Sequence, residues 1–139
     1  MVDVLKLCIP GKPEYVGTVR MALAHVAAHA GYDIEAIDDI KVAVSEACTN
    51  IIIHSHTSAD FTYDVIIECA EKSLTISVVD EGTGFEMGDY MEPIPGETRG
   101  SGMGIFIVRA LMDEVDIKTE IGVGTNIRMT KYLQVRTVQ

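Results

Sequence analysis

Residues 45–54 read Ser-Glu-Ala-Cys-Thr-Asn-Ile-Ile-Ile-His, an apolar stretch that carries polar side chains at regular intervals. Glu46, Asn50 and His54 lie four residues apart, and this spacing places all three on one face of an α-helix, because residues i and i+4 are neighbours one turn apart. Most polar stripes of this kind are simply the solvated face of an amphipathic helix. A further role for the stripe depends on what the rest of the chain places beside it.

Length and composition favour one folded domain. The 139 residues are enough to bury a core, so we expect a single domain over 1–139, with a core over 1–133 and a frayed tail over 134–139. The formal net charge of −10 disfavours a nucleic acid or an anionic membrane as partner, because phosphate binding relies on Lys and Arg. The sequence shows neither a run of about 18 apolar residues nor an N-terminal signal, so we expect a cytoplasmic protein.

The cysteines and two of the histidines suggest no metal or disulfide chemistry. Cys8, Cys48 and Cys69 are odd in number and widely spaced in apolar segments, so we expect buried, reduced thiols. His25 and His29 share a predicted helix face, but no third ligand joins them, so we expect surface histidines.

Hydrophobic periodicity predicts the element order β-α-α-β-β-α-β-β. Gly31 is expected to end the first helix and Asp33 to cap the second. Hairpinned strands and grouped helices predict an α+β fold, a two-layer sandwich of helices on a sheet. The strands are expected at 4–9, 61–69, 73–79, 115–120 and 125–133, and the helices at 14–30, 33–53 and 105–112.

Two glycine-rich segments stand at the ends of predicted elements. Residues 80–85, Asp-Glu-Gly-Thr-Gly-Phe, follow a buried strand directly, and residues 100–104, Gly-Ser-Gly-Met-Gly, lead into the third helix. Glycines before a helix let the backbone approach a phosphate and direct N–H groups toward it, although plain loops use the same residues. The pattern is neither a Walker P-loop nor a Rossmann fingerprint.

Three other side chains could complete a nucleotide site around these glycines. Asn50 offers an amide oxygen of the kind that Mg²⁺ accepts. Asp80 could accept a hydrogen bond from an exocyclic amine and so select adenine, or it could merely cap a turn. Residues 86–99 lack periodicity and contain glycine and proline, as lids do. Arg99 beside the glycines could steady a γ-phosphate.

Taken in order, four segments of the chain resemble the N, G1, G2 and G3 boxes of the GHKL ATP-binding superfamily. Within that superfamily the chain is most similar to the bacterial anti-sigma factor serine/threonine-protein kinases of the stress-response and sporulation type, from about Ile9 to Leu133. The four boxes are Glu46-x3-Asn50-x3-His54, Asp80-x-Gly82-x-Gly84, Gly100-x-Gly102-x-Gly104 and Gly122-x-Gly124-Thr125; residues 13–16, 39–50, 111–115 and 129–133 carry the closer similarity.

The resemblance implies the GHKL, or Bergerat, ATP-binding fold, with a mixed, mainly antiparallel sheet. It implies that Glu46 is the general base, that Asn50 holds Mg²⁺ and that Asp80 binds the adenine amine. The residues that would contact ATP or ADP are Asn50, Asp80, Gly82, Gly84, Arg99, Gly100, Ser101, Gly102, Met103, Gly104, Ile105 and Thr125.

The resemblance also implies partners. A serine on a small anti-anti-sigma antagonist would accept the phosphate, a sigma factor would be sequestered when the antagonist is phosphorylated, and the protein would form a homodimer near its first strand and helix. Arg20 would face a partner, with a solvated arginine as the alternative. Alternative functions are a switch kinase of a signalling complex, an ATP-binding module that sequesters a partner without phosphoryl transfer, and an ATPase, although ATPase relatives take a lysine from a second domain.

Overall fold

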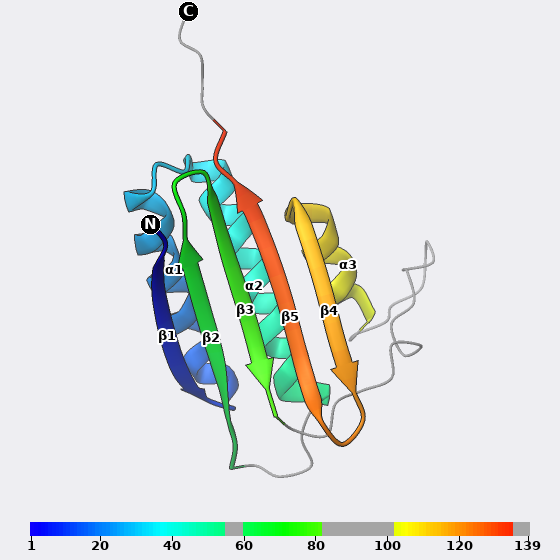
Figure 1. The fold of residues 1–139 in the computed structure, drawn as a ribbon. Coiled ribbons are helices and arrows are strands. Elements are labelled where there is room, and N and C mark those ends of the chain that lie inside the picture. The colour runs from blue at the N-terminus through cyan, green and yellow to red at the C-terminus, as the bar shows by residue number, and fades with distance from the viewer. Residues whose placement is uncertain (55–59, 82–101, 135–139) are drawn as a thin grey trace, which may run out of the picture.

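The computed structural model describes residues 1–54, 60–81 and 102–134, and in these residues helices cover one face of a five-stranded sheet (Figure 1). The predicted element order and the α+β two-layer class are confirmed. In chain order the elements are β1 (Asp3–Pro10), the 3-10 helix η1 (Pro13–Tyr15), α1 (Val16–His29), α2 (Ile34–His54), β2 (Thr62–Cys69), β3 (Ser73–Asp80), α3 (Gly102–Leu111), β4 (Glu114–Glu120) and β5 (Gly124–Tyr132).

The strands lie in the order β1-β2-β3-β5-β4, and each neighbouring pair among the described strands is antiparallel. The parallel pair that a mixed sheet requires is therefore not found in this part of the chain. The reason lies in the position of β5. The connection through α3 makes β4 run in the same direction as β3, but β5 lies between them and pairs with both.

The junction between α1 and α2 follows the predicted signals. Gly31 adopts a φ of +96°, a conformation that other residues rarely adopt, and the amides of Gly31 and Tyr32 donate to the carbonyls of Ala28 and Ala27. This pattern is a Schellman motif, which ends a helix. Asp33 then accepts a hydrogen bond from the Ala36 amide at 2.8 Å through its side chain, as an N-cap does. The short turn brings α2 back along α1.

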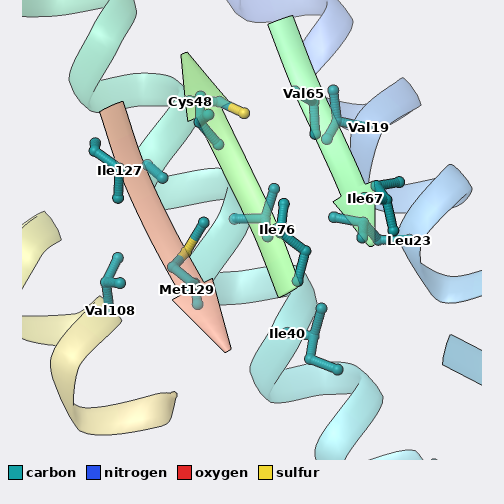
Figure 2. Close-up of a cluster of buried hydrophobic side chains, with 14 of the residues drawn as sticks. Val19, Leu23, Ile40, Cys48, Val65, Ile67, Ile76, Val108, Ile127 and Met129 are labelled. Atoms are coloured by element: carbon teal, nitrogen blue, oxygen red, sulfur yellow. The ribbon is translucent and has the colours of Figure 1, made fainter. Parts of the chain in front are cut away.

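The core fills the space between the sheet and the helices (Figure 2). Val65 pairs with Val78 and Ile67 with Ile76 across β2 and β3, so that these side chains share one face of the sheet. That face packs against apolar side chains of all three described α-helices. The labelled core residues of Figure 2 are Val19, Leu23, Ile40, Cys48, Val65, Ile67, Ile76, Val108, Ile127 and Met129.

Two predictions for single residues or elements are wrong. Helix α3 begins at Gly102 and not at Ile105, so that Gly102 and Gly104 lie in its first turn. Cys8 is exposed on the edge strand β1 and Cys69 is only half-buried, whereas Cys48 is buried as expected. Burial raises the pKa of the Cys48 thiol to about 12 and so keeps it protonated.

The two histidines of α1 are exposed as predicted. The rings of His25 and His29 lie 4.3 Å apart between centroids, and among the described residues no group of three or more His, Cys, Asp or Glu side chains could hold a metal ion. Within the same residues, the helices are too short or too polar to cross a membrane.

Candidate functional site

One end of the sandwich collects buried polar side chains. Asp80 is the last residue of β3, and its cross-strand partner is Thr125 at the start of β5. Both side chains are only 3% exposed, and they share the helix-covered face with Val78 and Ile127. The pairing of β3 with β5 thus brings together two residues that are 45 positions apart in the sequence, as the predicted adenine site requires.

Gly124 makes this close pairing possible. Its φ is +138°, and a Cβ built on it would overlap the backbone carbonyl oxygen of Asp80 and lie 2.9 Å from the Cα of Glu81. A residue with a side chain would therefore push β5 away from the end of β3. Gly124, the glycine of the fourth box, therefore allows the backbone of β5 to lie against the backbone of Asp80.

A pocket of about 520 Å³ opens beside these residues. This volume is in the range of small-molecule sites. Thr119 of β4 contributes to the lining, and its hydroxyl lies 3.0 Å from the hydroxyl of Thr125. Thr119 belongs to none of the four boxes, although its alternation with Val115 and Ile117 places it on the inner face of β4. Asp80, Glu81, Val123, Gly124, Thr125 and Asn126 also line the pocket.

The polar stripe of α2 is not a solvated face. Asn50 is 5% exposed, and Glu46 and His54 are half-buried. Burial of an amide on a helix that packs against the sheet requires polar surroundings, because a buried polar group without a hydrogen bond is costly. The solvated-face interpretation, which is the usual one for such a stripe, is therefore wrong for α2.

Helix α3 approaches this stripe through a glycine. A Cβ on Gly104 would lie 3.0 Å from Oε2 of Glu46 and 3.8 Å from its Cβ. Glycine costs about 1 kcal/mol relative to alanine inside a helix, so its presence here is explained by the close approach of the two helices. The Glu46 carboxylate therefore lies beside the first turn of α3.

This arrangement would place a proton acceptor beside a helix N-terminus, where an anion can bind. The first N–H groups of a helix have no partner within the helix, and they lie at the positive end of its dipole. A phosphate bound there would lie next to the Glu46 carboxylate, which could accept a proton from an attacking hydroxyl. Asn50, one turn further along α2, could offer its amide oxygen to Mg²⁺ near the same phosphate.

The remaining predicted site residues fall into three groups. Gly102 and Met103 belong to the first turn of α3, as a phosphate cradle requires. Ile105 is 4% exposed and belongs to the hydrophobic core, so its side chain packs α3 against the core. Gly82, Gly84, Arg99, Gly100, Ser101 and the predicted lid at 86–99 lie outside the described residues.

Arg20 is not a fully solvated arginine. It is half-buried on α1, and its Nη1 donates to the Ser45 hydroxyl at 3.2 Å. Ser45 in turn donates to the Lys41 carbonyl at 2.7 Å. The guanidinium group therefore joins α1 to α2 one residue before Glu46.

Comparison with known proteins agrees with the resemblance found in the sequence motifs. The family model of the histidine kinase-like ATPase domain matches residues 9–131. A serine-protein kinase RsbW from Bacillus subtilis is 36% identical over 141 residues, which cover 94% of this chain and 86% of the relative. An RsbW from Listeria monocytogenes is 37% identical over 150 residues, covering 100% of this chain and 93% of the relative.

Solved structures support the fold. A crystal structure of RsbU and RsbW domains from Mycobacterium tuberculosis matches 99% of this chain and 35% of that longer chain, with a TM-score of 0.71 and 23% identity. A histidine kinase domain from Erythrobacter litoralis matches 90% of this chain and 62% of the other, with a TM-score of 0.52 and 21% identity. The chain belongs to the RsbW family of serine-protein kinases, and it carries their histidine kinase-like ATPase domain.

Proposed function

We propose that this protein serine kinase transfers the γ-phosphate of ATP to a serine of an anti-anti-sigma antagonist, and that it acts as an anti-sigma factor by sequestering a sigma factor. Its relatives are named serine-protein kinases, which supports the transfer to serine. The observation that carries the proposal is the position of the Glu46 carboxylate beside Gly104 in the first turn of α3. A proton acceptor and a phosphate site then lie together.

In the proposed reaction Glu46 takes the proton of the serine hydroxyl while the hydroxyl oxygen attacks the γ-phosphorus. The bond between the β,γ-bridging oxygen and the γ-phosphorus breaks, and ADP leaves. Phosphoryl transfer depends mainly on positioning and on stabilising charge. The N–H groups at the start of α3 would stabilise the phosphate oxygens.

The other site residues would bind and orient ATP. Asn50 would hold Mg²⁺, which neutralises phosphate charge when it is bound. Asp80 would accept a hydrogen bond from the adenine amine, with Thr125 beside it. For Gly82, Gly84, Arg99, Gly100 and Ser101, the motif in the sequence is the support.

We also propose a homodimer that uses the region of β1 and α1, in a cytoplasmic protein. The edge strand β1 and its neighbours expose large apolar side chains, and an exposed apolar group of this kind is typical of a contact surface. Arg20 would face a protein partner, since it belongs to α1, which is part of this proposed contact region. The exposed apolar residues are Val2, Val4, Leu5, Tyr15 and Met21.

The first experiment incubates the purified protein with Mg-ATP and antagonist candidates and measures phosphoserine by mass spectrometry. We expect Glu46→Gln to lower the turnover number by about 10²- to 10⁴-fold, the usual contribution of a general base, while the Kd of ATP changes little. Glu35→Gln, an exposed glutamate in the first turn of the same helix, is the matched control and should be fully active.

Other outcomes identify other functions. ATP binding without phosphoserine on any candidate would indicate a sequestering module, and steady ATP hydrolysis without a protein acceptor would indicate an ATPase. Light scattering after gel filtration of the protein with a sigma factor measures both the dimer and the captured complex. Arg20→Ala should weaken the capture and leave ATP binding unchanged.

A further inference from the structure

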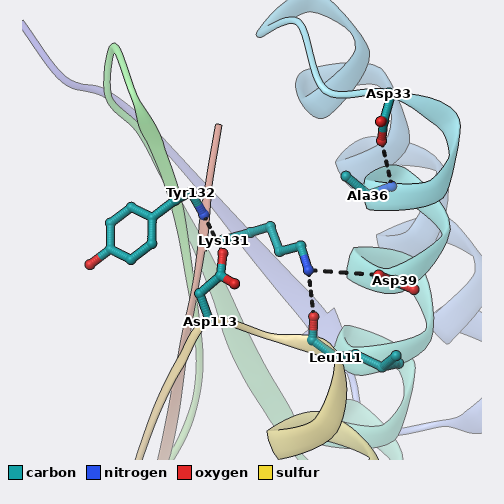
Figure 3. Close-up of polar contacts among 7 residues, drawn as sticks. All are labelled: Asp33, Ala36, Asp39, Leu111, Asp113, Lys131 and Tyr132. Carbon is teal, nitrogen blue, oxygen red and sulfur yellow. Dashed lines mark hydrogen bonds and ion pairs between the residues drawn. The ribbon is translucent and has the colours of Figure 1, made fainter. Parts of the chain in front are cut away.

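At the end of the sandwich opposite the proposed ATP site, the ammonium group of Lys131 lies between α2 and α3 (Figure 3). Lys131 lies near the end of β5, and its side chain is 16% exposed. Its Nζ donates to the carbonyl of Leu111 at 2.6 Å and lies 3.6 Å from Oδ2 of Asp39. One side chain thus joins β5 to both α2 and α3.

Lys131 completes the C-terminal end of α3. Leu111 is the last residue of this helix, and carbonyls of the last turn lack an N–H partner within the helix. A cation is favourable there because this is the negative end of the helix dipole. The turn that follows α3 is also hydrogen-bonded to β5. The Asp113 amide donates to the Thr130 carbonyl at 3.0 Å, and the Asp113 side chain accepts from the Tyr132 amide at 2.7 Å.

The distances along the two helices match. Asp39 and Glu46 are seven residues apart on α2, and Gly104 and Leu111 are seven residues apart on α3. Both intervals correspond to about 10.5 Å along a helix axis. Gly104 lies beside Glu46, and Lys131 joins Leu111 to Asp39, so α2 and α3 run in opposite directions with two matched contact points.

The residue type also needs an explanation. Along β5 the inward-facing positions Ile127 and Met129 are apolar, and Lys131 continues that alternation. A charge at such a position is costly unless it is paired and hydrogen-bonded. The contacts with Leu111 and Asp39 supply both, but an apolar side chain would have avoided the cost.

We propose that Lys131 is a positioning residue for phosphoryl transfer. Its ammonium group fixes α3 along the axis of α2 and so keeps the phosphate-binding first turn of α3 beside Glu46 and Asn50. A sliding motion of α3 would have to break the contacts of Lys131. A displacement of 1 Å at a reacting group can reduce the rate by about 10²-fold, so this control of position matters for the reaction. The inference rests on the roles proposed above for Glu46 and for α3.

Lys131→Met tests the proposal, because it keeps the apolar stem and removes the donor. The phosphate site should be displaced while the adenine pocket, which is built on β3 and β5, is kept. We therefore expect the Kd of Mg-ATP to rise by about 10-fold, because the loss of a charge-assisted hydrogen bond at the far end of α3 lets its phosphate-binding first turn shift, and that of adenosine to rise by less than about 2-fold. Calorimetry measures the first constant and NMR titration the second.

Variants of the same contact should give graded results. Lys131→Arg should restore most of the Mg-ATP affinity, because it can donate to the same carbonyl. Asp39→Asn should have a smaller effect than Lys131→Met, because the hydrogen bond to Leu111 remains. The matched controls are Lys72→Met, an exposed lysine in the turn between β2 and β3, and Asp38→Asn, an exposed neighbour of Asp39; both should bind Mg-ATP as the unmodified protein does.

Two results would overturn the proposal. One is an equal loss of affinity for Mg-ATP and adenosine, which indicates a general structural defect. The other is unchanged Mg-ATP affinity in a folded Lys131→Met protein with a lower melting temperature. If Lys131→Met does not fold, unchanged Mg-ATP affinity in Asp39→Asn has the same meaning. Full transfer activity of Glu46→Gln would instead refute the proposed role of Glu46, so the two failures are distinguishable.

Discussion

The two ends of the helix–sheet sandwich use polar residues in different ways. At the end of the proposed ATP site, Asp80 and Thr125 are buried next to a pocket, Gly124 lets β5 approach the backbone of Asp80, and Gly104 lets α3 approach Glu46. At the opposite end, polar groups fasten elements to one another, as when the Tyr32 hydroxyl donates to the Lys131 carbonyl at 2.7 Å.

This difference predicts which substitutions should affect stability and which should affect ligand binding. A polar side chain beside a pocket contributes little to folding and much to ligand binding, whereas one that joins two elements contributes mainly to folding. Changes at the ATP end should therefore alter binding and turnover with small effects on stability. Changes at the opposite end should do the reverse, with Lys131 as the proposed exception.

Asp80→Asn should have the largest effect on nucleotide binding. An amide in place of the carboxylate replaces a charged acceptor with a neutral one, and since a hydrogen bond to a charged group contributes about 1.5–3 kcal/mol, the Kd of ADP should rise by up to about 10- to 150-fold. Calorimetry measures this Kd. The control is Asp116→Asn, an exposed aspartate on β4. Unchanged ADP affinity, or equal affinity for guanine and adenine nucleotides in the unmodified protein, would show that Asp80 does not select the base.

Gly104→Ala should produce a moderate loss of activity together with a gain in helix stability. The new Cβ would force the Glu46 carboxylate to shift, and we expect turnover to fall by about 10-fold. The free energy of unfolding should not fall much, because alanine favours a helix by about 1 kcal/mol over glycine. Steady-state kinetics and thermal melting measure the two effects.

Gly17→Ala is the matched control for Gly104→Ala. Gly17 also lies in a helix, but the nearest atom to its Cβ position is Nη2 at the end of the long Arg20 side chain, at 3.3 Å. This variant should gain stability without loss of turnover. If both alanine variants kept full turnover, the close approach of α3 to Glu46 would have no functional role.

Tyr32→Phe should have the smallest effect, and on stability alone. Loss of its hydrogen bond should lower the free energy of unfolding by about 1 kcal/mol at pH 7, with unchanged ADP affinity. Burial, with Cys69 and Asp113 adding, raises the pKa of Tyr32 to about 12 in the folded protein. In the unfolded chain it ionises near 10.

The pH dependence follows from this difference in pKa. Between pH 10 and 12 the folded state retains a proton that the unfolded state has lost, so the contribution of Tyr32 is complete below pH 10 and decreases as the pH rises through 12. Its share of the slope is about 1.4 kcal/mol per pH unit. Urea unfolding of Tyr32→Phe should show a flatter alkaline decline, whereas Tyr15→Phe, an exposed tyrosine, should not.

Local signals allowed most elements to be predicted. Gly31 and Asp33 act within a few residues of their own positions, and the structure confirms both. Helix α3 begins earlier than predicted because Gly102 and Gly104 disfavour a helix in isolation, and contact with α2 outweighs this preference. Cys8 is exposed because β1 is an edge strand, and neighbouring residues in the sequence do not reveal the edge.

The candidate site was predictable as motifs and not as contacts. The four boxes name Glu46, Asn50, Asp80 and Thr125, and the structure brings Asp80 next to Thr125. Thr119 was missed because it belongs to none of the boxes and reaches the pocket only through the pairing of β4 with β5.

The family, the order of the elements and the identity of the residues in the boxes follow from the amino-acid sequence alone, because periodicity, turn residues and motifs are local properties. Three features are visible only in the folded protein: β5 lies between β3 and β4, Gly104 lies against Glu46, and Lys131 joins α3 to α2. The contacts of Gly104 and Lys131 join residues that are 20 to 92 positions apart, and such residues meet only when the hydrophobic core packs the helices on the sheet. The polar stripe of α2 has its meaning from that packing.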